Sequence, residues 1–404
     1  MNGALENITV IDMSRVLAGP WASQMLADFG ADVIKIERPD HGDETRYWGP
    51  PFIKNKTSNQ PPQSAYYHCT NRNKKSIAID INKPDGQKII KDLIVKSDVL
   101  IENFKVGGLI KYGLDYESIK KLNPNLIYCS ITGFGQNGPS ANRAGYDAMI
   151  QGEGGLMSIT GESEGEPMKV GVALVDVMAG LYSCNAILAA LMARNKIKKG
   201  QHIDISLLDV QAATLANQGM NYLSTKNNPK RHGNSHPNIV PYQTFKTKDG
   251  RIILAIGNDS QFKRFCQLTD SNYLSIDKKY DSNENRVINR ETLIPILQKI
   301  LQTKPTQWWI NKLESIDVPC GPVNKLSQVF EHPQLKHRKL IKQVPDKDGN
   351  LVDTIGSPIN LTETPLIYKS ASPELSQHCE QILESSLGYS KNKISELKRS
   401  KIIS

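Results

Sequence analysis

Asp176 is the strongest candidate for chemistry in this chain of 404 residues, because it stands alone in an apolar stretch. It is the only acid between Pro167 and Ile203, and its neighbours are mostly Val, Ala, Leu and Met. Burying an ionised carboxylate there is costly unless hydrogen-bond donors or a helix end stabilise it. The position predicts a nucleophile, a general base or the N-cap of an apolar helix. Cap and nucleophile are compatible, since a helix N-terminus would also keep the carboxylate ionised.

Several other common sites find no support in the sequence. It contains no His-Glu-x-x-His and no Cys-x-x-Cys, so we expect no metal site. The absence of Gly-x-Ser-x-Gly disfavours a serine hydrolase. No Gly-x-Gly-x-x-Gly follows the first predicted strand and no P-loop occurs, which leaves NAD and ATP phosphate cradles unsupported.

Composition indicates an ordinary globular protein, with 50 basic and 41 acidic residues and a net charge of +9. That balance suits an anionic, phosphorylated ligand, and it equally suits solubility. No nucleic-acid-binding signature is present, so we expect no nucleic-acid partner. The six dispersed cysteines favour a reducing compartment. The strand-like start at Ile8 predicts no leader peptide, hence a cytoplasmic protein, or a matrix protein if this is a mature mitochondrial form. Val172–Ala193 is long and apolar enough to span a bilayer, but we expect a buried helix and no membrane partner.

The first half of the chain alternates between strand and helix patterns, which predicts an α/β, doubly wound parallel sheet. A loop rich in Pro, Gly and polar residues is expected at about 40–65. The expected strands are 8–12, 33–37, 76–80, 99–102 and 126–131, and the expected helices are 18–30, 84–96 and 119–122.

The remainder is predicted to form a smaller α+β domain and a C-terminal segment. Tyr242–Thr247 and Arg251–Ile256 flank an Asp-Gly turn and predict a hairpin, followed by helical stretches near 260–268 and 292–315. A last helix is expected over Ser376–Leu387. We place the large domain at residues 1–221, the small domain at 222–335 and the C-terminal segment at 336–404.

Ligands of doubly wound sheets bind beyond the carboxyl ends of the strands. The residues expected there include Ser14–Pro20, Glu37-Arg38, Glu102–Phe104 and Thr132–Gln136. Cations that could meet a phosphorylated ligand are Arg15, Arg38, Lys74, Lys75, Lys105, Lys111 and Arg143. For the distal carboxylate of a dicarboxylic acid, the candidate cations are Arg46, Arg72, Arg143 and His236.

Several long motifs resemble the class III CoA-transferases, and within them the succinyl-CoA:glutarate (succinate–hydroxymethylglutarate) group. They are Asp12–Pro20, Leu26–Pro39, Asn71–Ser76, Tyr128–Gly133, Arg143–Ala148, Gly171–Asp176, Ile239–Gln243 and Val318–Pro322. The resemblance implies a Rossmann-like large domain, a smaller domain, a C-terminal return to the large domain and an interlocked-ring homodimer. It also implies CoA thioester and carboxylic acid substrates and no tightly bound cofactor.

The resemblance assigns Asp176 as the nucleophile. It would form an aspartyl anhydride and an aspartyl-CoA thioester while CoA passes from a donor such as succinyl-CoA to a dicarboxylate such as glutarate or hydroxymethylglutarate. The implied CoA-binding residues are Val16, Leu17, Ala18, Arg38, Ile79, Asp80, Ile81, Asn82, Asn103, Phe104, Lys105, Lys111 and Arg143. The candidate residues for the acid substrate are Arg46, Arg72, Tyr146, Asp147 and His236.

Two alternatives stay open. The 2-methylacyl-CoA racemases share the fold and the aspartate, but pair it with a histidine where this chain has Tyr146 in Ala144–Asp147. Tyrosine, with an ordinary pKa of about 10, is a poor substitute in proton transfer, which favours a transferase. The other alternative is a CoA-binding protein without catalysis, in which Asp176 serves only as a helix cap.

Overall fold

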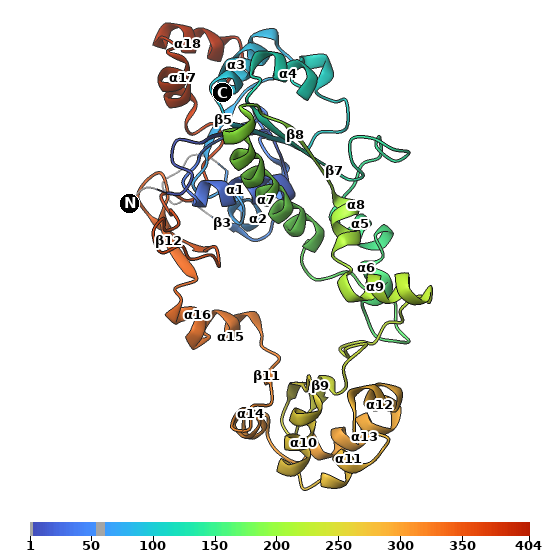
Figure 1. Cartoon of the computed structure of the whole chain (residues 1–404). Coiled ribbons are helices and arrows are strands. Elements are labelled where there is room, and N and C mark those ends of the chain that lie inside the picture. The colour runs from blue at the N-terminus through green and yellow to red at the C-terminus, as the bar shows by residue number, and fades with distance from the viewer. Residues whose placement is uncertain (1–2, 54–60) are drawn as a thin grey trace. The chain divides into compact units, whose positions relative to one another are not determined.

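The computed structural model describes residues 3–53 and 61–404, which form two compact units (Figure 1). Unit 1 comprises Met1–Leu156, Val170–Met220 and Gln334–Ser404. Unit 2 comprises Met157–Lys169 and Asn221–Pro333. Each unit is therefore described by itself.

Unit 1 is built on a six-stranded, wholly parallel sheet in the order β5-β2-β1-β6-β7-β8. The strands are β1 (Thr9–Asp12), β2 (Asp32–Glu37), β5 (Lys75–Ala78), β6 (Val99–Glu102), β7 (Ile127–Thr132) and β8 (His202–Ser206). This is the order of a doubly wound sheet, in which the chain moves outward from β1 in one direction and then from β6 in the other. The predicted parallel α/β sheet is confirmed.

Two apolar layers enclose the sheet, because successive strand residues point to opposite faces. Val10 faces the layer that contains α1 (Ala18–Asp28) and α7 (Leu174–Ile197). Ile11 faces the other layer, which contains α3 (Pro84–Val95). That second layer also includes α4 (Tyr116–Leu122), α17 (Cys379–Leu387) and α18 (Lys391–Arg399), so the last part of the chain packs into the core of unit 1.

The long apolar helix α7 belongs to the core of unit 1. It would be long and apolar enough to cross a membrane by length and composition alone. Val175, Ala179, Cys184 and Ile187 are buried in the layer shared with α1, beside which α7 lies in Figure 1. Other apolar side chains of α7 are exposed, among them Tyr182, Met192 and Ile197.

Shorter elements connect and extend this framework. They are η1 (Glu44–Tyr47), β3 (Phe52–Ile53), β4 (Gln63–Ser64), α2 (Ala65–His68), η2 (Ile110–Tyr112), α5 (Asp147–Glu153), α6 (Leu156–Ile159), α8 (Leu207–Ala213), α9 (Ala216–Thr225), α16 (Pro333–His337), β12 (Ile341–Pro345) and β13 (Leu351–Ile355).

Unit 2 packs its helices around a three-stranded sheet in the order β11-β10-β9. β9 (Tyr242–Lys246) and β10 (Arg251–Ala255) form the predicted antiparallel hairpin, and β11 (Cys320–Pro322) pairs with β10. The helices are α10 (Asp259–Leu268), α11 (Asn272–Ile276), α12 (Asn283–Ile288), α13 (Arg290–Leu301), α14 (Thr306–Glu314) and α15 (Leu326–Phe330).

The expected elements differ from the observed ones in three places. The helical stretch at 292–315 is two helices, α13 and α14, with Pro305 at the N-cap of the second. The loop expected at 40–65 contains η1, β3 and β4, and residues 54–60 lie outside the described part of the chain. Strand β8 was not predicted, because its sequence has only two apolar residues, Ile203 and Ile205.

Candidate active site

The loops after β1 and β6 meet where the order of the sheet reverses. Asn103, just beyond β6, accepts a hydrogen bond from the Arg15 backbone N–H at 2.9 Å and donates its Nδ2–H to the Arg15 carbonyl at 2.7 Å. This paired contact fixes the two loops to each other. Doubly wound sheets bind their ligands at this point, beyond the carboxyl ends of the strands.

A buried ion pair supports the loop after β1. Lys35 Nζ lies 3.0 Å from Asp43 Oδ2, and neither side chain is exposed. The Asp43 carboxylate accepts the Val16 backbone N–H at 3.3 Å, while Lys35 donates to the Ser14 carbonyl at 2.8 Å. Val16 has a φ of +71°, a region that β-branched residues rarely adopt. The ion pair therefore holds a strained turn, at a conformational cost of about 1–3 kcal/mol.

Asp176 is the third residue of α7 and is partly buried. The N-cap of this helix is Ala173, so the prediction that Asp176 itself caps the helix is wrong. The helix begins three residues earlier than the cap interpretation required, because Leu174, Val175 and Asp176 itself already belong to the helix. Asp176 consequently projects from the first turn, and its own carboxylate accepts no hydrogen bond from the described residues.

The cap is supplied by Asp147, the first residue of α5. Its Oδ1 accepts the backbone N–H of Val175 at 2.8 Å and that of Asp176 at 3.3 Å. Its Oδ2 accepts from Gln151 Nε2 at 2.6 Å, and Gln151 Oε1 in turn accepts the Val170 N–H at 2.8 Å. Two residues of α5 thus satisfy donors at and before the start of α7, as buried polar groups require.

Burial and the neighbouring Asp147 carboxylate together raise the pKa of Asp176 from 3.8 to about 7. The expectation that the helix start would keep this carboxylate fully ionised is therefore wrong. Desolvation disfavours the charged form, and a like charge adds to that effect. A carboxylate with a pKa close to neutral is a common property of catalytic sites.

A cavity of about 170 Å³ contains Asp176 together with seven of the thirteen predicted CoA-binding residues. Its lining includes Arg15, Val16, Leu17, Ala18, Asn103, Phe104, Lys105, Arg143, Tyr146 and Asp176. Arg143 makes a bidentate ion pair with Glu153, at 2.7 and 2.8 Å, and its guanidinium lies over Phe134. Arg15, Lys105 and Arg143 are the cations on this lining.

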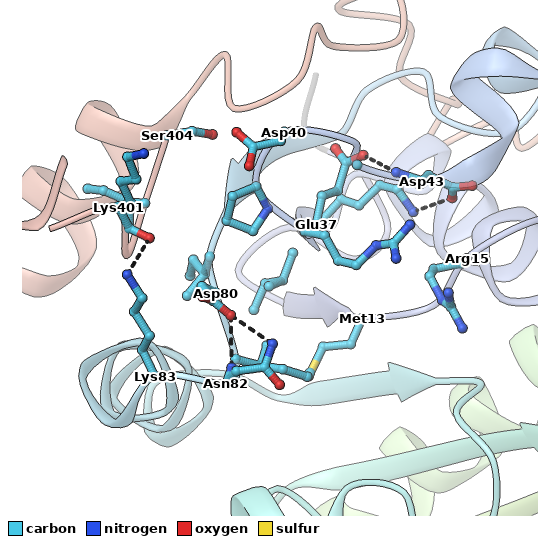
Figure 2. Close-up of a pocket in the computed structure, with 18 of the residues that line it drawn as sticks. Met13, Arg15, Glu37, Asp40, Asp43, Asp80, Asn82, Lys83, Lys401 and Ser404 are labelled. Atoms are coloured by element: carbon cyan, nitrogen blue, oxygen red, sulfur yellow. Dashed lines mark hydrogen bonds and ion pairs between the residues drawn. The ribbon is translucent and has the colours of Figure 1, made fainter. Parts of the chain in front are cut away.

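A second, larger cavity of about 810 Å³ adjoins the first, and Arg15 and Phe104 line both (Figure 2). Its volume lies within the range of small-molecule and cofactor sites. The remaining predicted CoA-binding residues on its lining are Arg38, Ile79, Asp80, Ile81 and Asn82. Arg38 follows β2 and the other four follow β5, and Figure 2 shows Asp80 and Asn82 on the same cavity as Lys401 and Ser404.

The cations between the two cavities share one carboxylate. Arg15 Nη1 lies 2.5 Å from Glu44 Oε1, and Arg38 Nη2 lies 3.5 Å from the same oxygen. Both arginines are partly exposed, and their charge exceeds that of the single acid between them. An anionic group at this junction would find two guanidinium partners of the kind that binds phosphate well.

Arg46 and Arg72 do not line either cavity and have other partners. Arg46, 3% exposed, binds Glu37 through Nε and Nη2, at 2.8 and 2.6 Å. Arg72, 5% exposed, grips both carboxylate oxygens of Asp28 and donates to the Ile355 carbonyl. Their guanidiniums are committed to buried pairs, which argues against the predicted contact with a substrate carboxylate.

Four further predicted residues also lie outside the cavity linings. Lys74 is buried against Asp12 at 3.0 Å, so its ammonium is not available to a phosphate. Lys75 makes an exposed pair with Asp32 at 2.8 Å and lines neither cavity. Lys111 is exposed and lies over the ring of Tyr112, which does line the larger cavity. His236 belongs to unit 2, where its ring stacks on Tyr242.

Sequence reasoning missed several residues of this region. Burial, followed by the Asp176 carboxylate, raises the pKa of Tyr66 well above its ordinary value. Tyr66 also packs edge-on against Trp48. Lys398, Lys401 and Ile403 line the larger cavity from the far end of the chain. No local pattern indicates such long-range contacts.

Among the described residues, no group of three or more His, Cys, Asp or Glu side chains could hold a metal ion.

Comparison with known proteins gives a consistent family. The sequence matches the description of CoA-transferase family III over residues 5–379. A relative from Agrobacterium fabrum (strain C58 / ATCC 33970), succinate–glutarate CoA-transferase, is 49% identical over 94% of this chain and 94% of its own length. The human succinyl-CoA:glutarate CoA-transferase is 43% identical over 97% of this chain and 88% of its own length.

A solved structure shows the same architecture. The crystal structure of a CAIB/BAIF family protein from Brucella suis superposes with a TM-score of 0.85 at 46% sequence identity. The match covers 96% of this chain and 100% of that one.

Proposed function

The chain belongs to CoA-transferase family III, and we propose that it transfers CoA from succinyl-CoA to a dicarboxylate such as glutarate or hydroxymethylglutarate, with Asp176 as the nucleophile. The observation that carries the proposal is the carboxylate of Asp176 in the smaller of two adjoining cavities. The substrates follow from the printed names of relatives that share 49% and 43% of their residues with this chain.

The donor half of the reaction has two steps. The Asp176 carboxylate attacks the thioester carbonyl of succinyl-CoA, the C–S bond breaks, and CoA thiolate leaves behind a succinyl–aspartyl anhydride. The thiolate then attacks the aspartyl carbonyl of the anhydride, which releases succinate and forms an aspartyl-CoA thioester. Each step replaces one acyl bond by another, so splitting the transfer in this way divides one barrier into smaller ones.

The acceptor half runs these steps in reverse order. A carboxylate of the acceptor attacks the aspartyl-CoA carbonyl, thiolate leaves, and an acceptor–aspartyl anhydride forms. The thiolate attacks the acceptor carbonyl, giving the new CoA thioester and restoring the Asp176 carboxylate. One thioester is consumed and one is made, and no proton is gained or lost overall.

The charges of the site suit a CoA thioester that lies across the two cavities in one orientation. The acyl group must reach Asp176 in the smaller cavity, so the nucleotide of CoA lies in the larger one. The pyrophosphate would pass the junction where Arg15 and Arg38 flank Glu44. Lys105 and Asn103 would contact the arm that carries the thiol.

Arg143 is our candidate for the distal carboxylate of the acceptor. It lines the cavity of Asp176, and its planar guanidinium matches a carboxylate in bidentate geometry. Its pair with Glu153 is exposed, so exchanging one carboxylate for another costs little. Tyr146 lines the same cavity, and its phenol is a further candidate contact.

We also propose that two copies assemble as a homodimer, in the interlocked arrangement that the family resemblance implies. The support is that large apolar side chains of α7, among them Tyr182, Met192 and Ile197, are exposed in the single chain. Exposed apolar patches are typical of interfaces. Light scattering checks the assembly directly, since a monomer mass at micromolar concentration would exclude it.

The chemistry is tested by trapping the intermediate. The protein is incubated with succinyl-CoA, reduced with borohydride and digested with trypsin. Cleavage after Lys169 and Arg194 releases a peptide of residues 170–194, in which Asp176 is the only acid. Conversion of its carboxyl group to an alcohol would therefore assign the acylated residue without ambiguity.

Matched controls separate the alternatives. Asp176→Asn should give neither the reduced peptide nor acceptor-CoA, and wild type without succinyl-CoA should be unmodified. Formation of glutaryl-CoA with an unmodified peptide would refute a covalent role for Asp176. Exchange of α-hydrogen for deuterium without CoA transfer would instead identify a racemase.

A further inference from the structure

The segment that follows α18 forms one wall of the larger cavity. Lys401, Ile403 and Ser404 from this post-α18 segment (residues 400–404) line it, together with Lys398 of α18. Figure 2 shows Lys401 and Lys83 on the side of the cavity opposite Arg15. Residues more than 300 positions apart in the sequence therefore enclose the same space.

Backbone contacts hold the post-α18 segment in place. The Asp80 N–H donates to the Ile402 carbonyl at 2.8 Å, and Ile79 forms a β-bridge with Ile403. Lys83 Nζ donates to the carbonyls of Ser400 at 2.5 Å and Lys401 at 3.1 Å. Ile402 and Ile403 are buried in the apolar layer beside α3. The wall is thus fixed to the end of β5 and the start of α3.

The ammonium groups of Lys83, Lys398 and Lys401 differ in their hydrogen-bond and ion-pair partners. Lys83 uses its ammonium to bind the two carbonyls of the segment. Lys398 Nζ lies 2.6 Å from Glu380 Oε1, so its charge is already balanced. Within the described residues, the Lys401 ammonium has no hydrogen-bond or ion-pair partner, and its side chain is exposed along the cavity (Figure 2). Lys401 is therefore the cation of this wall that is free to bind an anion.

We propose that Lys401 binds the 3′-phosphate on the ribose of CoA and so distinguishes CoA from its dephosphorylated form. The inference rests on the proposed function, because the thioester must lie at Asp176. Along CoA the order is then thioester, pantetheine arm, pyrophosphate and finally the nucleoside with its 3′-phosphate. Arg15 and Phe104 line both cavities, and Figure 2 shows Lys401 on the opposite side of the larger cavity from Arg15. The cation across the cavity from this junction would thus meet the phosphate that lies beyond the pyrophosphate.

Binding measurements with two ligands test this assignment. Calorimetry gives the dissociation constants of CoA and 3′-dephospho-CoA for wild type and for Lys401→Met, which keeps the length of the stem and removes the charge. We expect Lys401→Met to weaken CoA binding roughly tenfold, the worth of one charge-assisted contact, and to change dephospho-CoA binding less than about twofold. Lys401→Arg should retain the preference for CoA.

Lys391→Met is the matched control, since Lys391 is an exposed lysine at the start of α18 that lines neither cavity. It should bind both ligands like wild type. If Lys401→Met weakens both ligands equally, or neither, the assignment to the 3′-phosphate is overturned. If wild type binds neither CoA nor dephospho-CoA, the proposed function itself fails, a result distinct from the failure of this inference.

Discussion

Replacing Asp147 by Asn should make Asp176, the proposed nucleophile, ionise at lower pH. Asp147 and Asp176 are two carboxylates at the start of one helix, and the first raises the pKa of the second. Asparagine keeps an oxygen for the Val175 N–H, which Asp147 accepts at 2.8 Å, but removes the charge. Its amide would face Gln151 Nε2, so one hydrogen bond of 2.6 Å is lost. We expect a modest loss of stability, about 1 kcal/mol, from that bond.

The causes of the raised pKa of Asp176 set a limit on how far Asp147→Asn can lower that pKa. The pKa rises from 3.8 to about 7, and burial is the larger cause, with Asp147 second. Asp147 therefore accounts for less than half of the increase, or about one pH unit. Asp176 must be ionised to attack, so activity increases as the pH rises through its pKa. At pH 6 the ionised fraction would change from about one tenth to about one half, a gain of about fivefold.

The assay is the pH dependence of kcat/KM for succinyl-CoA, which reports groups of the free enzyme. Wild type should lose activity below about pH 7, and Asp147→Asn should show the same acidic limb about one unit lower. The height of the plateau reports the altered hydrogen bonding and does not enter the test. Asp85→Asn, at an exposed acid in the first turn of α3, controls for the loss of one negative charge. An unchanged limb, or one displaced to higher pH, would refute the reasoning.

Three further predictions follow from the same contacts. Asp176→Asn should abolish transfer yet raise the melting temperature at pH 8. Because the folded-state pKa of Asp176 is raised, this residue contributes stability below about pH 4 that is lost as the pH rises through about 7. The increase in melting temperature should therefore shrink toward pH 5. Arg72→Ala should lower the free energy of unfolding, measured in urea, by about 3–5 kcal/mol, because Asp28 is left charged and buried. The KM for glutarate in the folded fraction should stay the same. A selective rise in that KM would instead support the predicted contact of Arg72 with the substrate. Asn103→Ala should raise the KM for succinyl-CoA by freeing the Arg15 loop, whereas an effect confined to the KM for glutarate would contradict the contact between the loops.

The fold could be predicted from the sequence where a local pattern determines it. β1, β2, β6 and β7 are apolar runs separated by helix patterns, and such alternation specifies a parallel sheet. β8 escaped prediction because it is an edge strand with polar residues at alternate positions, so its pairing with β7 depends on distant partners. The split between α13 and α14 shows a related limit, since periodicity continues across a short break.

The site could be predicted only in part, for a physical reason. Asp176 was detectable because a lone acid in an apolar run is costly to bury, whatever its partners. Its electrostatic environment was not, since Asp147 lies 29 positions away and reaches it only through the packing of α5 on α7. Arg46 and Arg72 show the same limit: their charges were visible in the sequence, but the buried acids that pair with them were not.

The hydrogen bonds of the two aspartates explain why Asp176, the proposed nucleophile, does not cap its own helix. An acid at the third helix position ordinarily bonds back to the helix start, which stabilises its charge and lowers its pKa. Here Asp147 accepts the hydrogen bonds from the backbone N–H groups of Val175 and Asp176 instead. The lone pairs of Asp176 are left free, and its pKa of about 7 combines substantial ionisation at neutral pH with the nucleophilicity of a more basic carboxylate. If Asp176 capped the helix itself, it would be fully ionised but less nucleophilic, with its oxygens engaged in hydrogen bonds when the thioester arrives.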